Sequence, residues 1–171
     1  MTTPLAIATA RQDKLLTINT KDVPILRDSL APGIDVQPLF IDEEQGIWVI
    51  WASFAPGITL PRHFHTGQVF AWTLRGKWHY LEFPDQPQTA GSFLYEPGSS
   101  VHQFHTPATN TENTEAFFVV FGANVNFDDQ GNFAGMLDAA TIIQLATGLA
   151  KAQGHGKAQY ITRAGARATT D

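Results

Sequence analysis

The sequence of 171 residues contains no cysteine. Disulfide bonds are therefore excluded, and so are metal sites that are built on thiolate ligands. Any metal site in this chain has to use other side chains, and the sequence offers six histidines.

Basic residues are also few. Lysine and arginine together number 11 against 16 acidic residues, which gives a net charge of −5 and a pI of about 5.6. The basic side chains are scattered, whereas nucleic acids and anionic membranes are bound by clustered basic surfaces. We therefore expect neither a nucleic acid nor a membrane as a partner.

Long apolar runs are absent as well. No stretch of about 18 apolar residues occurs, so no membrane-spanning helix is expected. Residues 1–10 lack the basic start and the long apolar core of a secretory signal, which favours a cytoplasmic protein. The length suits one domain, and hydrophobic residues make up 43% of the chain, as in ordinary globular proteins.

Short apolar segments rich in β-branched and aromatic residues fill most of the chain, and proline and glycine separate them at short intervals. This pattern predicts an all-β sandwich or barrel. The predicted strands cover residues 36–41, 46–54, 68–74, 77–83, 91–95, 115–121 and 124–127.

One helix is predicted near the end of the chain, over residues 138–151. Asp138 is a candidate N-cap, and apolar residues recur there on one stripe of the helix. We expect this stripe to cover an open end of the barrel or a neighbouring subunit. The predicted organisation is a lead-in over 1–30, a barrel over 31–136, a helical segment over 137–153 and a flexible tail over 154–171.

Two histidines, His63 and His65, are separated by one residue just after Pro61. Side chains alternate along a strand, so both imidazoles are expected on the same face, with Cα atoms roughly 6.6 Å apart. Two imidazoles can close that gap on one ion at metal–nitrogen distances of about 2.1 Å. The ion needs a third ligand from another strand, and His102 is the candidate. The alternative is a half-exposed pair of histidines without a ligand role.

Glycine and proline frame these histidines at spacings that resemble the two sequence motifs of the cupin superfamily. The residues that carry the motifs are Gly57, His63, His65 and Gly76 in the first and Gly91, Pro97 and His102 in the second. The resemblance covers roughly residues 30–140. It implies an all-β fold, the cupin double-stranded β-helix, which is a small jelly-roll barrel.

The sequence departs from the motifs at three positions. Val69 stands where the first motif has glutamate, Ser99 stands where the second has glycine, and Thr106 stands where it has asparagine. The missing glutamate leaves three neutral imidazoles. That set resembles the three-histidine cupin dioxygenases, among them the acetylacetone-cleaving enzymes and the 2,4'-dihydroxyacetophenone dioxygenases.

This resemblance implies a mononuclear non-haem dioxygenase with His63, His65 and His102 as metal ligands. Such an enzyme cleaves a carbon–carbon bond next to a carbonyl in a small aryl or alkyl diketone or hydroxyketone, with dioxygen as the second substrate. Fe(II) is the implied metal, although imidazole ligands alone would also accept Zn, Ni or Cu. An ion held by three neutral rings keeps its full positive charge for an anionic chelating substrate.

Two polar residues are candidates for catalytic roles. Glu96 lies within the second motif, where the acetylacetone-cleaving enzymes also carry a glutamate, and is a candidate to orient a water or accept a substrate proton. Its alternative role is a surface carboxylate that caps a turn. Gln68 would face the metal only if a bulge shifts its strand. Val69, Ala71 and Thr73 share one strand face and are expected to line an apolar substrate pocket.

Several alternatives stay open. His79 is expected at the surface or the pocket rim. A metal role for His105 is disfavoured, because residues i and i+3 of an extended chain point to opposite faces. No chemical role is expected for His155. The chain could instead be a non-catalytic metal-binding cupin that acts as a sensor or ligand-binding protein, or a metal-dependent isomerase or hydrolase. The apolar strand over 115–121 leaves more apolar surface than one small barrel needs, which predicts a homodimer or homotetramer.

Overall fold

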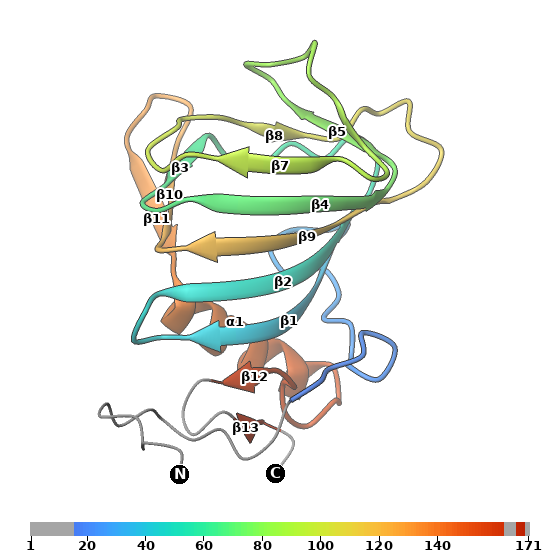
Figure 1. The fold of residues 1–171 in the computed structure, drawn as a ribbon, viewed down its shortest axis with the longest axis vertical. Coiled ribbons are helices and arrows are strands. Elements are labelled where there is room, and N and C mark those ends of the chain that lie inside the picture. The colour runs from blue at the N-terminus through green and yellow to red at the C-terminus, as the bar shows by residue number, and fades with distance from the viewer. Residues whose placement is uncertain (1–15, 163–166, 170–171) are drawn as a thin grey trace, which may run out of the picture.

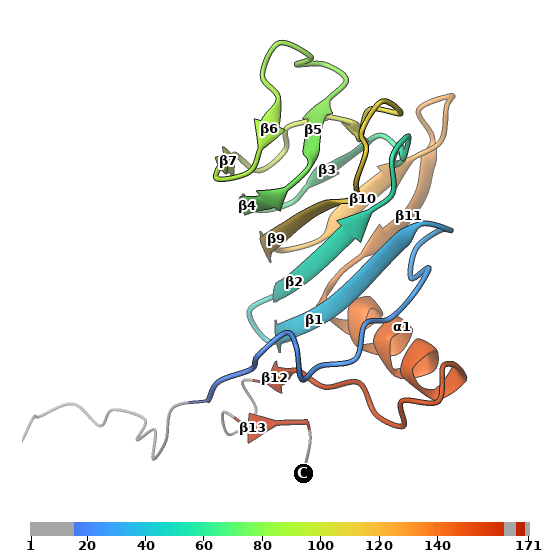
Figure 2. The same ribbon diagram turned by 90° about the vertical axis from the view of Figure 1, so that its right-hand side faces the viewer.

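The computed structural model describes residues 16–162 and 167–169. Two layers of strands face each other, and one helix lies at the lower end of the space between them (Figures 1 and 2). The predicted all-β fold with one helix near the C-terminus is confirmed. Within the described residues, no helix has the length and the apolar composition that crossing a membrane requires.

The larger layer is a seven-stranded sheet with the order β13-β12-β1-β2-β9-β4-β7. All its neighbours pair antiparallel except β1 and β12, which run parallel. Its strands are β1 (Ile34–Asp42), β2 (Ile47–Phe54), β4 (Val69–Arg75), β7 (Phe93–Glu96), β9 (Thr114–Phe121), β12 (Ile161–Thr162) and β13 (Arg167–Ala168).

The second layer consists of two three-stranded sheets, with the orders β11-β10-β3 and β6-β5-β8. A single β-bridge between His63 and His102 joins the first of these sheets to the segment before β8, with backbone hydrogen bonds of 3.0 and 2.9 Å. The strands are β3 (His63–His65), β5 (Lys77–Tyr80), β6 (Gln88–Thr89), β8 (Phe104–His105), β10 (Asn124–Phe127) and β11 (Phe133–Leu137).

The turn between β4 and β5 explains one glycine of the first motif. Gly76 has a φ of 74°, and a Cβ atom added there would lie 2.7 Å from the Cα of Thr114. No other residue fits without moving the backbone. The turn redirects the chain from the large sheet into the second layer, so that β5 lies opposite β4 rather than beside it.

Aromatic rings fill one part of the space between the layers. The ring of Phe104 packs against those of Phe54 and Trp78, with centroids 4.5 and 4.8 Å apart. Trp78 is fully buried, and its indole N–H donates a hydrogen bond of 2.9 Å to the hydroxyl of Thr73. This part of the interior is a packed core in which the buried polar groups have partners.

The helix α1 (Ala139–Ala152) begins at Asp138, whose carboxylate accepts a hydrogen bond from the backbone N–H of Thr141. It contacts β1 of the large sheet and β11 of the second layer. The helix therefore spans the two layers, and its apolar stripe covers an end of the barrel as expected. The residues that follow it, which the sequence assigns to a tail, contribute β12 beside β1.

Candidate metal centre

Three histidines converge at the junction within the second layer. His63 and His65 lie on β3 with their side chains buried on the same face, while Phe64 between them points the other way. His102 lies across the β-bridge from His63 and is also buried. One nitrogen from each ring lies within 4.8 Å of the others, and no other group of three such side chains occurs in the described chain.

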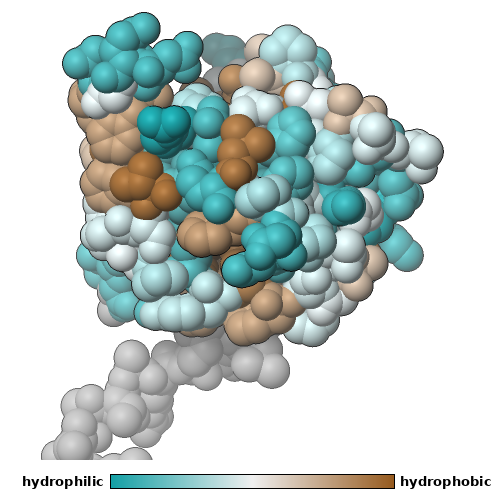
Figure 3. Space-filling model, turned by 90° about the horizontal axis from the view of Figure 1, so that it is seen from above, coloured by the Kyte–Doolittle hydropathy of each residue, from teal (hydrophilic) through white to brown (hydrophobic). Residues whose placement is uncertain are grey.

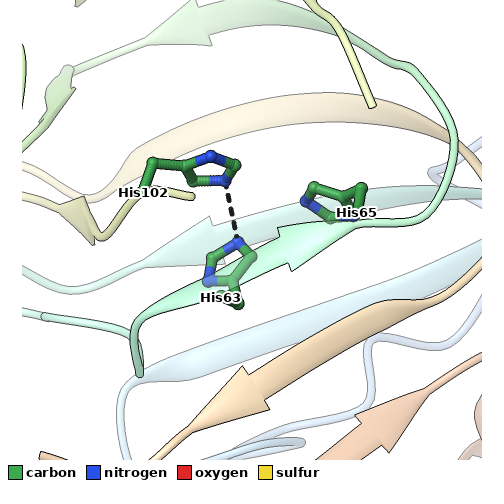
Figure 4. A group of neighbouring side chains, drawn as sticks. All are labelled: His63, His65 and His102. Atoms are coloured by element: carbon green, nitrogen blue, oxygen red, sulfur yellow. Dashed lines mark hydrogen bonds between the residues drawn. The ribbon is translucent and has the colours of Figure 1, made fainter. Parts of the chain in front are cut away.

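The spacing of these nitrogens suits a single ion. The Nε2 atoms of His63 and His102 are 3.1 Å apart (Figure 4). Two neighbouring ligands of an octahedral ion, each at a metal–nitrogen distance of about 2.1 Å, would be about 3.0 Å apart. The predicted convergence of the three imidazoles is confirmed.

Backbone carbonyls fix the orientation of two of the rings. Nδ1 of His63 lies 2.8 Å from the carbonyl oxygen of Pro61, and the carbonyl of Ser100 forms a hydrogen bond with His102. A carbonyl that accepts from one ring nitrogen leaves the lone pair of the other nitrogen free to bind a metal. Nε2 of His63 is therefore available at the centre, and Nε2 of His102 lies 3.1 Å from it.

The turn that delivers His102 is strained at the position where the cupin motif has glycine. Ser99 adopts a φ of 68°, in the left-handed region that glycine occupies most easily. Its backbone N–H donates a hydrogen bond of 2.7 Å to the carbonyl of His65. The strained turn is thereby tied directly to one of the histidines.

Burial keeps all three imidazoles neutral. Desolvation, together with a smaller effect of the neighbouring rings, lowers the pKa of His65 and of His102 to about 3. Desolvation also lowers the pKa of His63, against the opposing effect of its hydrogen bond to Pro61. Because metals bind the unprotonated ring, the three histidines fit a divalent ion as neutral donors at ordinary pH.

Glu96 brings a carboxyl group to the same centre. It pairs across the sheet with Val69, the residue that replaces the motif's glutamate, and only 4% of it is exposed. Its Oε1 lies 3.4 Å from Nε2 of His102 and 3.7 Å from Nε2 of His65, yet this oxygen forms no hydrogen bond. The predicted neighbourhood of Glu96 to the histidines is observed, and the alternative of a surface carboxylate does not hold.

These short contacts are not ion pairs in the metal-free protein. Burial raises the pKa of Glu96 to about 7, although the hydrogen bond from Tyr80 opposes the shift. The adjacent rings of His65 and His102 are neutral at that pH. A bound cation would favour the ionised carboxylate instead, so Glu96 can exist in either form near neutrality.

Two residues of the site are not predicted from the sequence. Tyr80 donates a hydrogen bond of 2.6 Å to Oε2 of Glu96, and its ring lies 4.2 Å from that of His102. Burial and the nearby Glu96 raise the pKa of Tyr80, which keeps the phenol protonated. Asn124 pairs with His65 across β10 and β3, and its buried Oδ1 has no hydrogen-bond partner. Residues two apart on a strand share a face, so the inward position of Trp78 is a sequence signal that Tyr80 also points inward. No signal in the sequence identifies Asn124.

The structure does not bring Gln68 to the centre. Gln68 is exposed just before β4, and Val69 takes the inward position. No bulge occurs there, so neighbouring side chains point to opposite faces. His79 and His105 form a cross-strand pair with ring centroids 5.3 Å apart, and neither belongs to the group at the centre.

A cavity of about 930 Å³, including its open mouth, extends from the histidines between the two layers. Its wall is mostly apolar and includes Val69, as expected. Ala71 and Thr73 share the inward face of β4 with Val69 and are buried, but they do not reach this cavity. They lie farther along β4, where Thr73 contacts Trp78 in the aromatic core.

The comparison with protein families matches residues 13–125 to the ChrR cupin-like domain. No protein with a curated description matches the chain. The matched residues include all three histidines.

Solved structures resemble the chain over most of its length. A protein of unknown function with a cupin-like fold from Ralstonia eutropha JMP134 is 46% identical, with a TM-score of 0.84 over 91% of this chain and 96% of that chain. An RmlC-like cupin from the same organism is 26% identical, with a TM-score of 0.77 over 82% and 90%. An acetylacetone dioxygenase from Acinetobacter johnsonii shares the fold at 16% identity, with a TM-score of 0.66 over 82% and 95%.

Proposed function

The chain belongs to the family of ChrR cupin-like domains, and from that premise we propose that it is a metal-dependent dioxygenase. The proposed reaction uses dioxygen to cleave the carbon–carbon bond next to a carbonyl in an aryl or alkyl diketone or hydroxyketone. The observation that carries the proposal is the set of three neutral, buried imidazoles that converge without a charged ligand in the first cupin motif.

His63, His65 and His102 are the proposed ligands of a ferrous ion. The ion, when bound, would supply Lewis acidity toward an anionic chelating substrate and the redox chemistry that dioxygen requires. Zinc, nickel and copper are alternative occupants, because neutral imidazoles accept each of them. Metal analysis of the protein purified without added metal tests this assignment, and iron is the expected result.

Glu96 is the proposed proton acceptor. The hydrogen bond from Tyr80 holds Oε2 and leaves Oε1 without a partner beside the two histidine rings. With a pKa raised to about 7, this carboxyl group can take the proton that a β-diketone or hydroxyketone loses when it becomes an anionic chelate. The buried Oδ1 of Asn124 is a second acceptor at the same end of the cavity.

The fold shared with an acetylacetone dioxygenase supports this substrate class. The apolar wall of the cavity supports it further, because such a wall favours a weakly polar ketone over a sugar or a highly charged metabolite.

An alternative is a metal-binding cupin without turnover, and a metal-dependent isomerase or hydrolase is another. Three neutral imidazoles also suit zinc, which favours the metal-binding cupin without turnover among these alternatives. Zinc content with ligand binding and no oxygen uptake would identify the first. Product formation under nitrogen would identify the second.

Oxygen uptake tests the proposed reaction. Iron-loaded protein is expected to consume oxygen when acetylacetone or a hydroxyacetophenone is added, and Glu96→Gln is expected to slow this uptake at least tenfold while the iron content stays the same. Glu112→Gln removes an exposed carboxylate and serves as the matched control. Absence of oxygen uptake with either ketone, at full iron content, would contradict the proposal.

The protein partner that we propose is a second copy of the chain, in a homodimer or homotetramer. The outer face of the large sheet carries Trp72, Phe93 and Tyr95, each about half exposed. The surface at the end of the molecule that carries β5 and β6 has no such row of rings among the described residues, because single apolar side chains lie there among polar ones (Figure 3). A row of exposed aromatic rings on a sheet is typical of an interface.

Light scattering tests the association. The wild type is expected to exceed the monomer mass at micromolar concentration, and Phe93→Ser is expected to shift it toward 18.7 kDa. Phe133→Ser alters an equally exposed ring on β11 and should leave the mass unchanged. A wild-type monomer would contradict the proposal.

A further inference from the structure

We propose that the cavity binds an extended apolar substituent of the substrate, an alkyl chain or an aryl group, which reaches from the three histidines to helix α1. Ala146 on this helix is the proposed residue that limits its length. The identity of the head group rests on the proposed function, whereas the binding of the chain rests on the cavity alone.

The path of the cavity follows the inner face of the large sheet. Its wall includes Val69 on β4, Val120 on β9, Ile50 on β2 and Val36 on β1. These four strands are consecutive neighbours in the sheet, so the path crosses three inter-strand spacings, or about 14 Å. It then continues to α1, which contacts β1 and β11.

Polar side chains are concentrated at one end of this path. His63, His65, Tyr80, Glu96 and Asn124 form the polar wall, and all five lie at the metal centre.

At the other end, Ser29 is the only polar side chain that the described residues contribute to the wall, and its hydroxyl donates a hydrogen bond of 2.6 Å to the carbonyl of Leu26. A ligand with one polar head and one apolar chain therefore fits in a single direction. Its head lies at the histidines and its chain points toward α1.

The far end is formed by two segments that are clamped together. The side chain of Gln153, at the end of α1, accepts a hydrogen bond of 3.0 Å from the backbone N–H of Arg27 and donates one of 2.8 Å to its carbonyl. Leu30 and Leu145 also line the cavity and are partly exposed. Ala146 lies one residue farther along the helix and is buried against the cavity.

The cavity wall extends farther from the histidines than a five-carbon diketone reaches. Acetylacetone chelated at the histidines would leave the wall from β9 to α1 without contacts. An apolar substituent would fill this space and displace water from it.

A series of diketones with increasing alkyl chain length measures whether the cavity binds an apolar substituent. Zinc-loaded protein under nitrogen is titrated by calorimetry with acetylacetone and with its butyl-, hexyl- and octyl-substituted homologues. Burial of one methylene contributes about 0.8 kcal/mol, so each added methylene should tighten binding about threefold to fourfold until the chain reaches α1. A dissociation constant that does not fall with chain length would overturn the inference.

Substitutions on α1 locate the end of the chain. Ala146→Phe places a ring in the path, and the ratio of the octyl to the acetylacetone affinity is expected to fall at least tenfold. Ala140→Phe adds the same ring at an exposed position of the same helix and should preserve the ratio. An unchanged ratio in Ala146→Phe, with an unchanged melting temperature, would show that the chain lies elsewhere.

A second probe separates this inference from the proposed function. Straight-chain alcohols from butanol to decanol are titrated into the metal-free protein, where no chelation contributes. Affinity that rises with alcohol length supports the cavity assignment even if no diketone binds or is consumed. Turnover of acetylacetone together with affinities that are flat in both series would support the enzyme and overturn the proposed chain site.

Discussion

Two sets of buried polar side chains lie inside the same barrel, and they differ in whether their hydrogen-bonding atoms have partners. Away from the histidines, the hydroxyls of the buried residues Thr73, Thr106 and Thr114 all form hydrogen bonds within the protein. At the histidine centre, Oε1 of Glu96 and Oδ1 of Asn124 have none. A buried polar atom without a partner destabilises the fold, so these two oxygens beside the histidines indicate a group that is completed by a ligand.

The largest effect is expected from His102→Ala. Removal of one of three ligands should weaken metal binding by at least about a hundredfold, because two imidazoles hold an ion only weakly. Metal content after dialysis, measured by mass spectrometry, checks this. His155→Ala, at an exposed position after α1, should retain the full metal content. Retention of one equivalent of metal by His102→Ala would mean that the ion binds elsewhere.

The stability of the metal-free protein should depend strongly on pH. The folded-state pKa values of His65 and His102 are about 3, and that of His63 is also lowered, so the three rings take up protons on unfolding. Their contribution to stability is complete above the unfolded-state pKa of about 6.5 and is lost as the pH falls toward 3.

Glu96 acts in the opposite direction. Its pKa is raised to about 7, so its contribution is present below the unfolded-state value of about 4.5 and is lost as the pH rises toward 7. Three rings oppose one carboxyl group, and the free energy of unfolding should therefore rise between pH 4.5 and 6.5. Urea unfolding of chelator-treated protein at several pH values measures this. A flat profile would contradict the neutral state of the rings.

A smaller effect, on stability alone, is expected from Thr73→Val. The substitution preserves the shape of the side chain and leaves the indole N–H of Trp78 buried without an acceptor, at a cost of about 1–3 kcal/mol. Metal affinity should not change. Thr147→Val on the exposed side of α1 is the matched control and should lie within about 0.5 kcal/mol of the wild type in urea unfolding. Metal loss in Thr73→Val would contradict the claim that the aromatic core and the histidine centre are independent of each other.

The smallest effect is expected from Gln68→Ala. This side chain is exposed beside the buried Val69, so the free energy of unfolding should stay within about 0.5 kcal/mol and metal affinity should match the wild type. The comparison with Glu96→Gln in the same assays tests the position of the two residues on opposite sides of the sheet. A metal affinity reduced tenfold would place Gln68 at the centre after all.

The strands that the sequence predicts most accurately are the long ones. The expected strands over 46–54 and 115–121 correspond to β2 and β9 within one residue at each end, because both are long and rich in β-branched and aromatic residues. The strand expected over 77–83 ends at Tyr80, where a turn begins with a hydrogen bond from the N–H of Phe83 to the carbonyl of Tyr80. The short strands β3, β6 and β8 carry too few residues for a pattern to appear.

The amino-acid sequence by itself determined that His63 and His65 share a face, because the alternation of side chains along a strand is a local property of the backbone. It also determined the turns that deliver His102, through the spacing of glycine and proline. Only the tertiary structure decided that Glu96 lies opposite Val69, that Tyr80 holds it, and that the cavity continues to α1. Those relations depend on the register between strands and on where the helix packs, which are set by contacts between residues far apart in the chain.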